Sequence, residues 1–193
     1  MGTDNLFQKV EKSFVNGTND REACPKRWIA VLVQKNCEKK AEAKLNNLGF
    51  ETYLPIQKEE RQWSDRRKVI DRIVIPMVVF VRVEQNEIRT IRNYSFIHKL
   101  LTIPGSTQVA TPIPDEQIEN LKYLLSNAET SVSIVPYLRI GGKVRIIRGA
   151  LKGYEGLLCM LNENHKTVAI RINGLGYAYV TVSCDDLESI KGE

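Results

Sequence analysis

Residues Arg27–Leu45 read RWIAVLVQKNCEKKAEAKL, and this stretch decides the fold of the first half of the chain. Its first eight residues, Arg27–Gln34, form an apolar run rich in β-branched side chains, which predicts a buried strand. A helix is predicted directly after it, with Asn36 as N-cap and Gly49 just past its end. Three apolar residues repeat at the spacing of one helical face: Ala41, Leu45 and Leu48.

Further apolar runs continue this pattern to about residue 128. Three more strands are predicted, at Phe50–Ile56, Met77–Val83 and Ile97–Thr102. Two more helices are predicted, a short one at Asn86–Tyr94 and a longer one that begins near Pro114. The order strand–helix–strand–strand–helix–strand–helix predicts an α+β sandwich domain.

The last part of the chain, residues 139–193, is predicted to be all-β. Four short strand candidates are separated by Gly-rich or Asn-rich turns: Lys143–Arg148, Tyr154–Met160, Thr167–Ile172 and Tyr177–Val182. In the third of these, Val168, Ile170 and Ile172 alternate with residues expected to face solvent. So many strands in so few residues predict a small closed barrel, because an open sheet would leave unprotected edges.

These patterns divide the chain into four predicted parts. They are a mobile N-terminal tail at 1–25, the α+β domain at 26–128, a linker at 129–138 and the barrel at 139–193. The tail shows no helical or strand period, and the linker loses helical spacing and runs through Ser131, Ser133 and Pro136.

Composition and motifs exclude several classes of protein. The 193 residues are 42% hydrophobic and 26% charged, as in folded soluble proteins, and no apolar run reaches the roughly 18 residues of a membrane span. Four cysteines without a C-x-x-C pair predict reduced thiols and no metal or cofactor. No catalytic triad or phosphate loop is recognisable. We therefore expect a cytoplasmic, monomeric protein that is not an enzyme and does not bind membranes.

The net charge of +5 favours anionic partners. At 100° per residue, Lys40 and Lys44 fall on one flank of the first helix, whereas Glu38 and Glu42 fall on the other. Together with Lys35, the two lysines are candidates for phosphate contacts. A solvated helix face with partial ion pairing is the alternative.

A second basic cluster lies between the predicted strands that end at Ile56 and begin at Met77. Residues 61–72 carry five basic and two acidic side chains around Trp63. Arg66, Arg67 and Lys68 are the candidates for nucleic-acid contacts there. An exposed charged hairpin with Trp63 folded back explains the same pattern.

Two stretches carry a resemblance to a known family. Residues 141–158, GGKVRIIRGALKGYEGLL, resemble a KOW motif with Gly149, Gly153 and Gly156 in its turns and bend. Upstream, RWIAVLVQKNCEKKAEAKL, then TYLP, then a charged hairpin, then IPMVVFV resemble the NusG N-terminal domain in order and spacing. The chain is thus similar to NusG-family transcription elongation factors, and its tail and divergent pocket resemble the UpxY-type paralogues of capsule operons.

The resemblance implies that the N-terminal domain docks an apolar cavity on the clamp helices of RNA polymerase and favours processive elongation. By position, six residues would form this cavity: Ile29, Ile75, Pro76, Val78, Phe80 and Leu100. A place in the hydrophobic core is the alternative for each of them. The family usually carries aromatic residues here, so the largely aliphatic set of this chain implies a patch of different shape.

The resemblance also implies two further partners. Related paralogues read the non-template DNA strand with basic residues at the start and flank of the first helix, which correspond to Lys35, Lys40 and Lys44. The C-terminal barrel of the family binds a ribosomal small-subunit protein or the termination factor Rho. The turn Asn173–Gly176 lacks the aromatic residue usual there, which disfavours Rho. A ribosome-associated, RNA-binding KOW protein is the alternative function.

Overall fold

The computed structural model describes residues 25–62, 67–103, 109–135, 139–162, 165–183 and 186–190. The predictions for the N-terminal tail, for Trp63 and for Arg66 concern positions outside these ranges, apart from Pro25 at the end of the tail.

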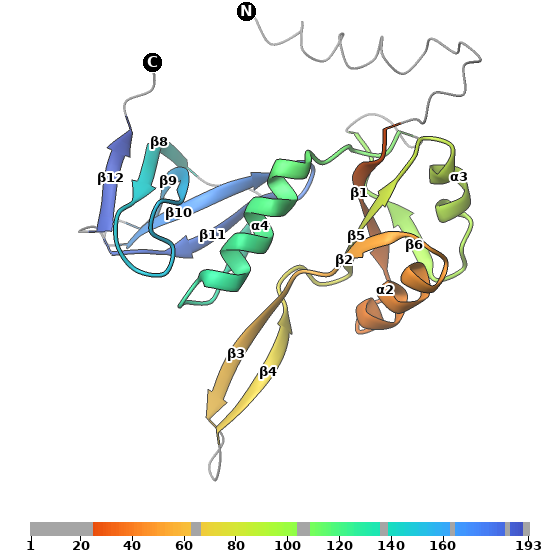
Figure 1. The fold of residues 1–193 in the computed structure, drawn as a ribbon, viewed down its shortest axis with the longest axis horizontal. Helices are drawn as coiled ribbons and strands as arrows, with labels where there is room; N and C mark the ends of the chain where they lie inside the picture. Colours follow the sequence, from red (N-terminus) through yellow and green to blue (C-terminus); the bar gives the residue numbers. More distant parts are fainter. Residues whose placement is uncertain are drawn as a thin grey trace, which may run out of the picture.

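The first half of the chain forms a four-stranded antiparallel sheet (Figure 1). Its strands lie in the order β2 (Glu51–Tyr53), β5 (Val78–Val83), β1 (Arg27–Val33) and β6 (Ile97–Leu100). Helices α2 (Glu38–Asn47) and α3 (Glu87–Arg92) contribute Ala41, Leu45 and Ile91 to a buried cluster with one face of this sheet. Because side chains alternate along a strand, the other face of β1 and β5 remains for a second layer.

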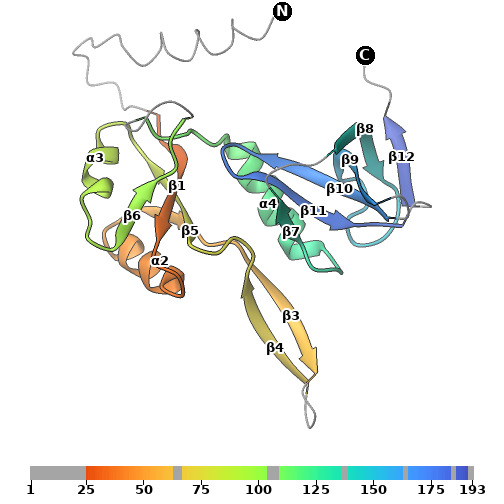
Figure 2. The ribbon, with the colours of Figure 1, turned by 180° about the vertical axis from the view of Figure 1, so that it is seen from behind.

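That second layer is helix α4 (Asp115–Asn127). Its Ile118, Leu121 and Leu124 are fully buried and belong to the same apolar cluster as Trp28 and Phe80 of the sheet. The cluster continues through α4 into the C-terminal sheet, and the helix also packs against β10. Helix α4 lies between the two sheets, as Figures 1 and 2 show in views from opposite sides. One hydrophobic core therefore joins both halves of the chain.

Strands β3 (Ile56–Gln62) and β4 (Arg67–Ile73) form a separate antiparallel hairpin. It projects away from both sheets, so that only its base lies near the rest of the molecule (Figure 1). The prediction of a charged hairpin at this place in the chain is confirmed.

The C-terminal half is a six-stranded antiparallel sheet. Its order is β12 (Leu187–Ile190), β8 (Arg139–Ile146), β9 (Glu155–Asn162), β10 (His165–Ile172), β11 (Gly176–Thr181) and β7 (Ser133–Val135). The mixed α/β fold with a β-rich C-terminal part is confirmed, whereas closure into a KOW barrel stays a prediction. Strand β7 lies inside the segment 129–138 that the sequence pattern indicates as a linker.

Two local predictions about α2 are wrong. Asn36 adopts a left-handed conformation (φ 64°) in a turn, so the helix begins at Glu38 with Cys37 rather than Asn36 at the N-cap position. Leu48 follows the last helical turn and is 49% exposed, outside the apolar stripe.

The expected solvent face of β10 is also wrong in part. Thr167 and Ala169 are as buried as Val168, whereas Arg171 is exposed. The Thr167 hydroxyl donates to the carbonyl of Cys159 at 3.0 Å, which satisfies its polar group inside the sheet. Both faces of this part of the strand are therefore covered.

Candidate nucleic-acid interface and apolar docking face

A pocket of about 450 Å³ opens beside helix α2 and strand β6. Its lining includes Gln34, Cys37, Lys40, Lys44, Phe96 and His98. The lysines are four residues apart on α2 and so lie on one side of the helix. Antiparallel pairing of β1 with β6 sets Val33 opposite Ile97, which brings Phe96 and His98 to the same place. The pocket thus combines two cations with an aromatic ring and an imidazole.

The charge of this pocket is not neutralised by acidic residues on α2. Glu38 is 2% exposed and accepts a hydrogen bond from the backbone N–H of Met77 at 2.9 Å, so it does not lie on the solvent flank that the sequence predicts. Burial raises the pKa of Glu42, which is half-buried. In the described part of the chain Lys40 and Lys44 form no ion pair, whereas Lys39 pairs with Asp71 at 2.7 Å.

Phe96 is the aromatic wall of the pocket. The Nζ atom of Lys44 lies 4.9 Å from the centre of its ring, and Tyr94 stacks on it with ring centres 5.5 Å apart. The half-buried ring thus lies between a neighbouring aromatic ring and a positive charge that an exposed, movable side chain carries. Nucleobases stack on aromatic rings and phosphates pair with cations, which makes this pocket the candidate site for a single-stranded nucleic acid.

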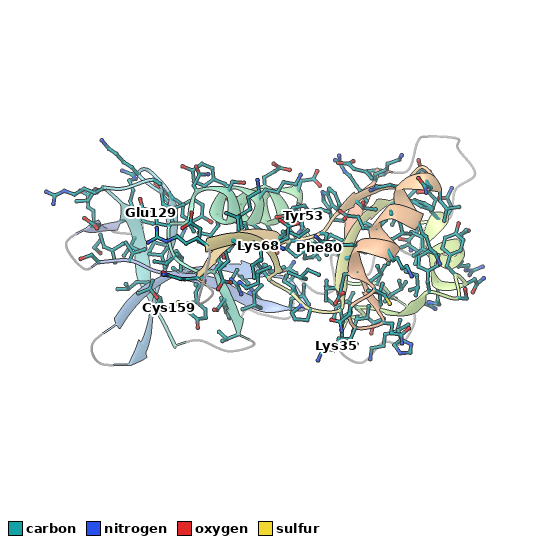
Figure 3. All side chains as sticks on the ribbon, turned by 90° about the horizontal axis from the view of Figure 1, so that it is seen from below. Lys35, Tyr53, Lys68, Phe80, Glu129 and Cys159 are labelled. Carbon is teal, nitrogen blue, oxygen red and sulfur yellow. The ribbon has the colours of Figure 1, made fainter. Side chains whose placement is uncertain are left out.

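The other basic candidates come from separate elements. Lys35 is exposed in the turn before α2, next to Gln34 of the pocket, and Arg67 and Lys68 are exposed on β4. Figure 3 shows Lys68 on the hairpin and Lys35 beside the N-terminal sheet. The register sets Lys68 opposite Arg61 in the hairpin.

The six residues predicted to form the polymerase-binding cavity do not share one surface. Ile75, Val78 and Phe80 belong to the apolar cluster that contains α4. Ile29 and Leu100 belong to the cluster that α2 and α3 cover. Pro76 is exposed in the turn before β5. The first group lies on the α4 side of the N-terminal sheet, which we call the apolar docking face after the role that the resemblance implies for it.

Sequence reasoning missed two aromatic residues of this docking face, Trp28 and Tyr53. Tyr53 stacks on Phe80 with ring centres 6.0 Å apart, and Trp28 is 2% exposed in the same cluster. The Nζ atom of Lys122 on α4 lies 5.4 Å from the ring centre of Tyr53 and 5.5 Å from that of Trp28. Figure 3 shows Tyr53 and Phe80 next to each other. The place of Trp28 on this face could have been predicted from the alternation of side chains along β1. The contact of Tyr53 with Phe80 could not, because it depends on the register between β2 and β5.

The glycines of the KOW-like stretch lie where the chain turns or packs closely. Gly149 and Gly153 have positive φ values in the turn between β8 and β9. A Cβ atom on Gly156 would lie 2.5 Å from the side chain of Val168, so β9 and β10 approach each other too closely there for any other residue.

The turn between β10 and β11 contacts the first half of the chain. The backbone N–H of Asn173 donates to the side-chain oxygen of Gln117 at 2.8 Å, and the Gln117 amide donates to Asn173 Oδ1 at 3.2 Å. A Cβ atom on Gly174 would lie 2.6 Å from Leu101. This turn, predicted from the resemblance to bear on Rho binding, is therefore a contact between the two halves.

No helix in the described ranges is both long and apolar enough to cross a membrane. The same residues contain no group of three or more His, Cys, Asp or Glu side chains suited to a metal ion.

Comparison with known proteins identifies the class of this protein. Residues 26–122, half of the chain, match the family model described as "Transcription termination factor nusG". The proteins of this class are transcription factors that catalyse no reaction. The chain belongs to the NusG family. No curated protein matches the sequence.

Solved structures of NusG and Spt5 proteins are similar at low identity. A structure of Thermotoga maritima NusG, titled for its domain interaction, is 18% identical with a TM-score of 0.48, over 86% of this chain and 98% of that chain. Two conformations of the MjSpt4:Spt5 complex, A and B, are 15% and 16% identical, each with a TM-score of 0.27. They match over 86% of this chain and over 99% and 97% of their own chains.

Proposed function

We propose that this protein is an antitermination factor that binds RNA polymerase through residues 26–128 and keeps it in processive elongation. Membership of the NusG family supports a role in transcription elongation. The resemblance to UpxY-type paralogues supports action on particular operons, such as capsular polysaccharide loci. The C-terminal part, residues 139–193, would recruit a partner such as a ribosomal small-subunit protein, and its turn chemistry disfavours Rho.

The pocket beside α2 carries the nucleic-acid part of this proposal. Lys40 and Lys44 supply charge without an ion pair among the described residues, and Phe96 supplies an aromatic ring on which a base would stack in place of the Lys44 side chain. Non-template DNA exposed by a transcribing polymerase is a single strand with unstacked bases. Its phosphates would contact the lysines while a base stacks on the ring. Arg66, Arg67 and Lys68 would extend this contact along the hairpin.

The double variant Lys40→Glu/Lys44→Glu tests the pocket. Two lost phosphate contacts should weaken binding to a single-stranded oligonucleotide and reduce the slope of log K against log salt by about 1.4, at roughly 0.7 per contact. Fluorescence anisotropy at several salt concentrations measures both. The variant Lys26→Glu/Lys152→Glu changes the net charge equally at exposed positions away from the pocket. Equal binding by the two variants would refute the pocket as the nucleic-acid site.

The polymerase-binding part of the proposal rests on the apolar docking face. Val78 and Phe80 are 4% and 0% exposed beneath α4, so a partner helix gains access only when α4 moves from the sheet. The aromatic residues Trp28, Tyr53 and Phe80 would then form an apolar surface of the kind that binds a partner helix. Ile29 and Leu100, on the opposite face, would support this sheet from behind.

A further inference from the structure

The hairpin of β3 and β4 is joined at its base to residues 130–132, the segment that follows α4. The Gln57 side-chain oxygen accepts a hydrogen bond from the N–H of Val132 at 2.9 Å, and its amide donates to the carbonyl of Thr130 at 2.9 Å. Arg72 lies opposite Gln57 in the hairpin register and donates to the carbonyl of Val132 at 2.6 Å and to the Gln57 oxygen at 2.9 Å. We call Gln57 and Arg72 the hairpin anchor.

The hairpin anchor is restrained on both of its sides. Val132 is fully buried in the apolar cluster that contains α4, and Gln57 is 5% exposed. The Nε atom of Arg72 lies 3.1 Å from the Glu59 carboxylate, an ion pair that restrains the guanidinium. Buried hydrogen bonds of this kind resist bending, because breaking one leaves a polar group without a partner and away from water.

The basic residues of the hairpin lie far from this anchor. Arg67 is five residues from Arg72 along β4, about 16 Å at roughly 3.3 Å per residue. At that length a tilt of about 20° at the anchor would move Arg67 by about 6 Å, more than the roughly 4 Å over which an ion pair forms. The ion pair of Lys39 on α2 with Asp71 on β4 is exposed and opposes such a tilt only weakly. The hairpin anchor therefore decides where the basic end of the hairpin lies.

We propose that Gln57 and Arg72 are positioning residues for nucleic-acid binding. They hold Arg67 and Lys68 at a fixed place relative to α2, so that one strand contacts the pocket beside α2 and the hairpin at the same time. The hairpin starts beside this helix, to which Asp71 joins it. Two contact sites in a fixed arrangement bind one strand more tightly than two sites that must be ordered on binding. This inference rests on the proposed function in one respect, namely that a single strand binds both the pocket and the hairpin.

NMR relaxation of the backbone amides of the full chain tests the anchoring without any nucleic acid. In the wild type, the order parameters of residues 58–60 and 68–70 should match those of β1 and β5, about 0.85. Gln57→Leu removes no charge and should lower them below about 0.6 while β1 and β5 stay rigid. Gln117→Leu is the matched control, because Gln117 makes the same kinds of hydrogen bond to Asn173, at 2.8 and 3.2 Å, between α4 and the β10–β11 turn.

Arg72→Lys is a second variant of the hairpin anchor. It keeps the charge but loses the planar fork that joins the Val132 carbonyl to Gln57, so it should free the hairpin in the same way. It decides the anchoring if Gln57→Leu does not fold. Unchanged order parameters and unchanged relaxation dispersion of the hairpin in the folded variants would overturn the proposal.

Binding of a short and a long oligonucleotide tests the positioning role. Single strands of about 4 and about 16 nucleotides bracket the usual site sizes, and only the longer one should reach from the pocket to the hairpin. Gln57→Leu should bind the long strand about 3- to 10-fold more weakly than the wild type and the short strand equally. The salt slope for the long strand should not change, since every basic residue remains.

A double-mutant cycle separates positioning from a general loss of stability. Once Arg67→Glu/Lys68→Glu has removed the basic end of the hairpin, adding Gln57→Leu should not weaken binding of the long strand further. A further loss in that background would overturn the positioning role, as would wild-type binding of the long strand by a Gln57→Leu variant whose hairpin is mobile. If the wild type binds neither strand, the nucleic-acid role is refuted and this inference with it, whereas the relaxation data still decide the anchoring.

Discussion

Phe96 illustrates how one side chain can separate two kinds of binding. Its ring forms a half-buried wall of the pocket, with Lys44 Nζ 4.9 Å above it. Stacking on an aromatic ring does not release counterions, whereas phosphate contacts do. The contribution of the ring to oligonucleotide binding should therefore be independent of salt.

Phe96→Leu should weaken oligonucleotide binding by about 1–3 kcal/mol, the usual worth of one base stacked on an aromatic ring. The slope of affinity against salt should stay that of the wild type. Anisotropy titrations at three salt concentrations measure both quantities. Tyr123→Leu removes an exposed ring on α4 and should change neither. A reduced slope in Phe96→Leu would indicate that the ring acts only by positioning Lys44.

Tyr53 makes the folded state sensitive to alkaline pH. Burial, and then the nearby Glu119 carboxylate, raises the pKa of its hydroxyl above the ordinary value near 10. Above that value the unfolded chain loses the proton while the folded chain keeps it, so the free energy of unfolding falls as pH rises. Tyr53→Phe cannot ionise. Its melting temperature should fall less than that of the wild type between about pH 9 and about pH 11, and an equal fall would contradict this.

At the scale of elements, α4 decides whether the apolar docking face is accessible. Its Lys122 lies above the rings of Trp28 and Tyr53, and cation–π contacts of this kind stabilise by about 0.5–1 kcal/mol at partly exposed sites. The same side chain pairs with Glu119 on the helix surface at 2.8 Å. Replacing Lys122 should weaken the packing of α4 on the N-terminal sheet without removing an apolar side chain.

Lys122→Glu should therefore increase binding to core RNA polymerase by roughly 2- to 5-fold, the equivalent of losing those contacts. Co-elution at a series of polymerase concentrations measures the change. Lys152→Glu, an exposed turn residue, is the matched charge reversal. Weaker binding by Lys122→Glu would indicate that α4 itself contacts polymerase and need not move.

The local spacing of apolar residues predicted most helices and strands, because the buried residues of each element are close together in the sequence. Ala41 and Leu45 mark α2 at helical spacing, and Ile118, Leu121 and Leu125 mark α4. The pattern failed where a non-local contact decides. Asn36 looks like a cap but turns left-handed, Thr167 looks exposed but is covered, and β7 looks like a linker but finds an edge on β11.

The candidate site was predictable only in its helical part. Lys40 and Lys44 follow from their spacing on α2, since four residues bring them to one side. Phe96 and His98 lie more than 50 positions further along the chain and reach the pocket through the pairing of β1 with β6. The register between β1 and β6 leaves no periodic pattern in the sequence from which it could be predicted. For the same reason the sequence did not divide the six cavity residues between two faces of the sheet.

At the scale of the whole molecule, the two sheets share one apolar core through α4. Leu121 is fully buried in this core. Its loss should therefore weaken both halves together rather than the helix alone. A shared core also predicts that the two halves unfold in one transition.

Leu121→Ala should lower the free energy of unfolding by about 2–5 kcal/mol, the usual cost of such a cavity. Urea denaturation followed by circular dichroism and by tryptophan fluorescence should give coincident curves before and after the change. Leu48→Ala removes a side chain that is 49% exposed and should cost within about 0.5 kcal/mol. Two separated transitions would show that the halves unfold independently.

The close contact between Gly174 and Leu101 makes the packing of the two halves depend on the absence of a Cβ atom at position 174. Because residue 174 has no side chain, the β10–β11 turn packs directly against the first half of the chain, beside Thr111. A methyl group there would force the Leu101 side chain to shift, and the φ of 76° at this position would be strained for a residue with a side chain. The close packing of the two halves therefore depends on a position in the β10–β11 turn that suits only glycine.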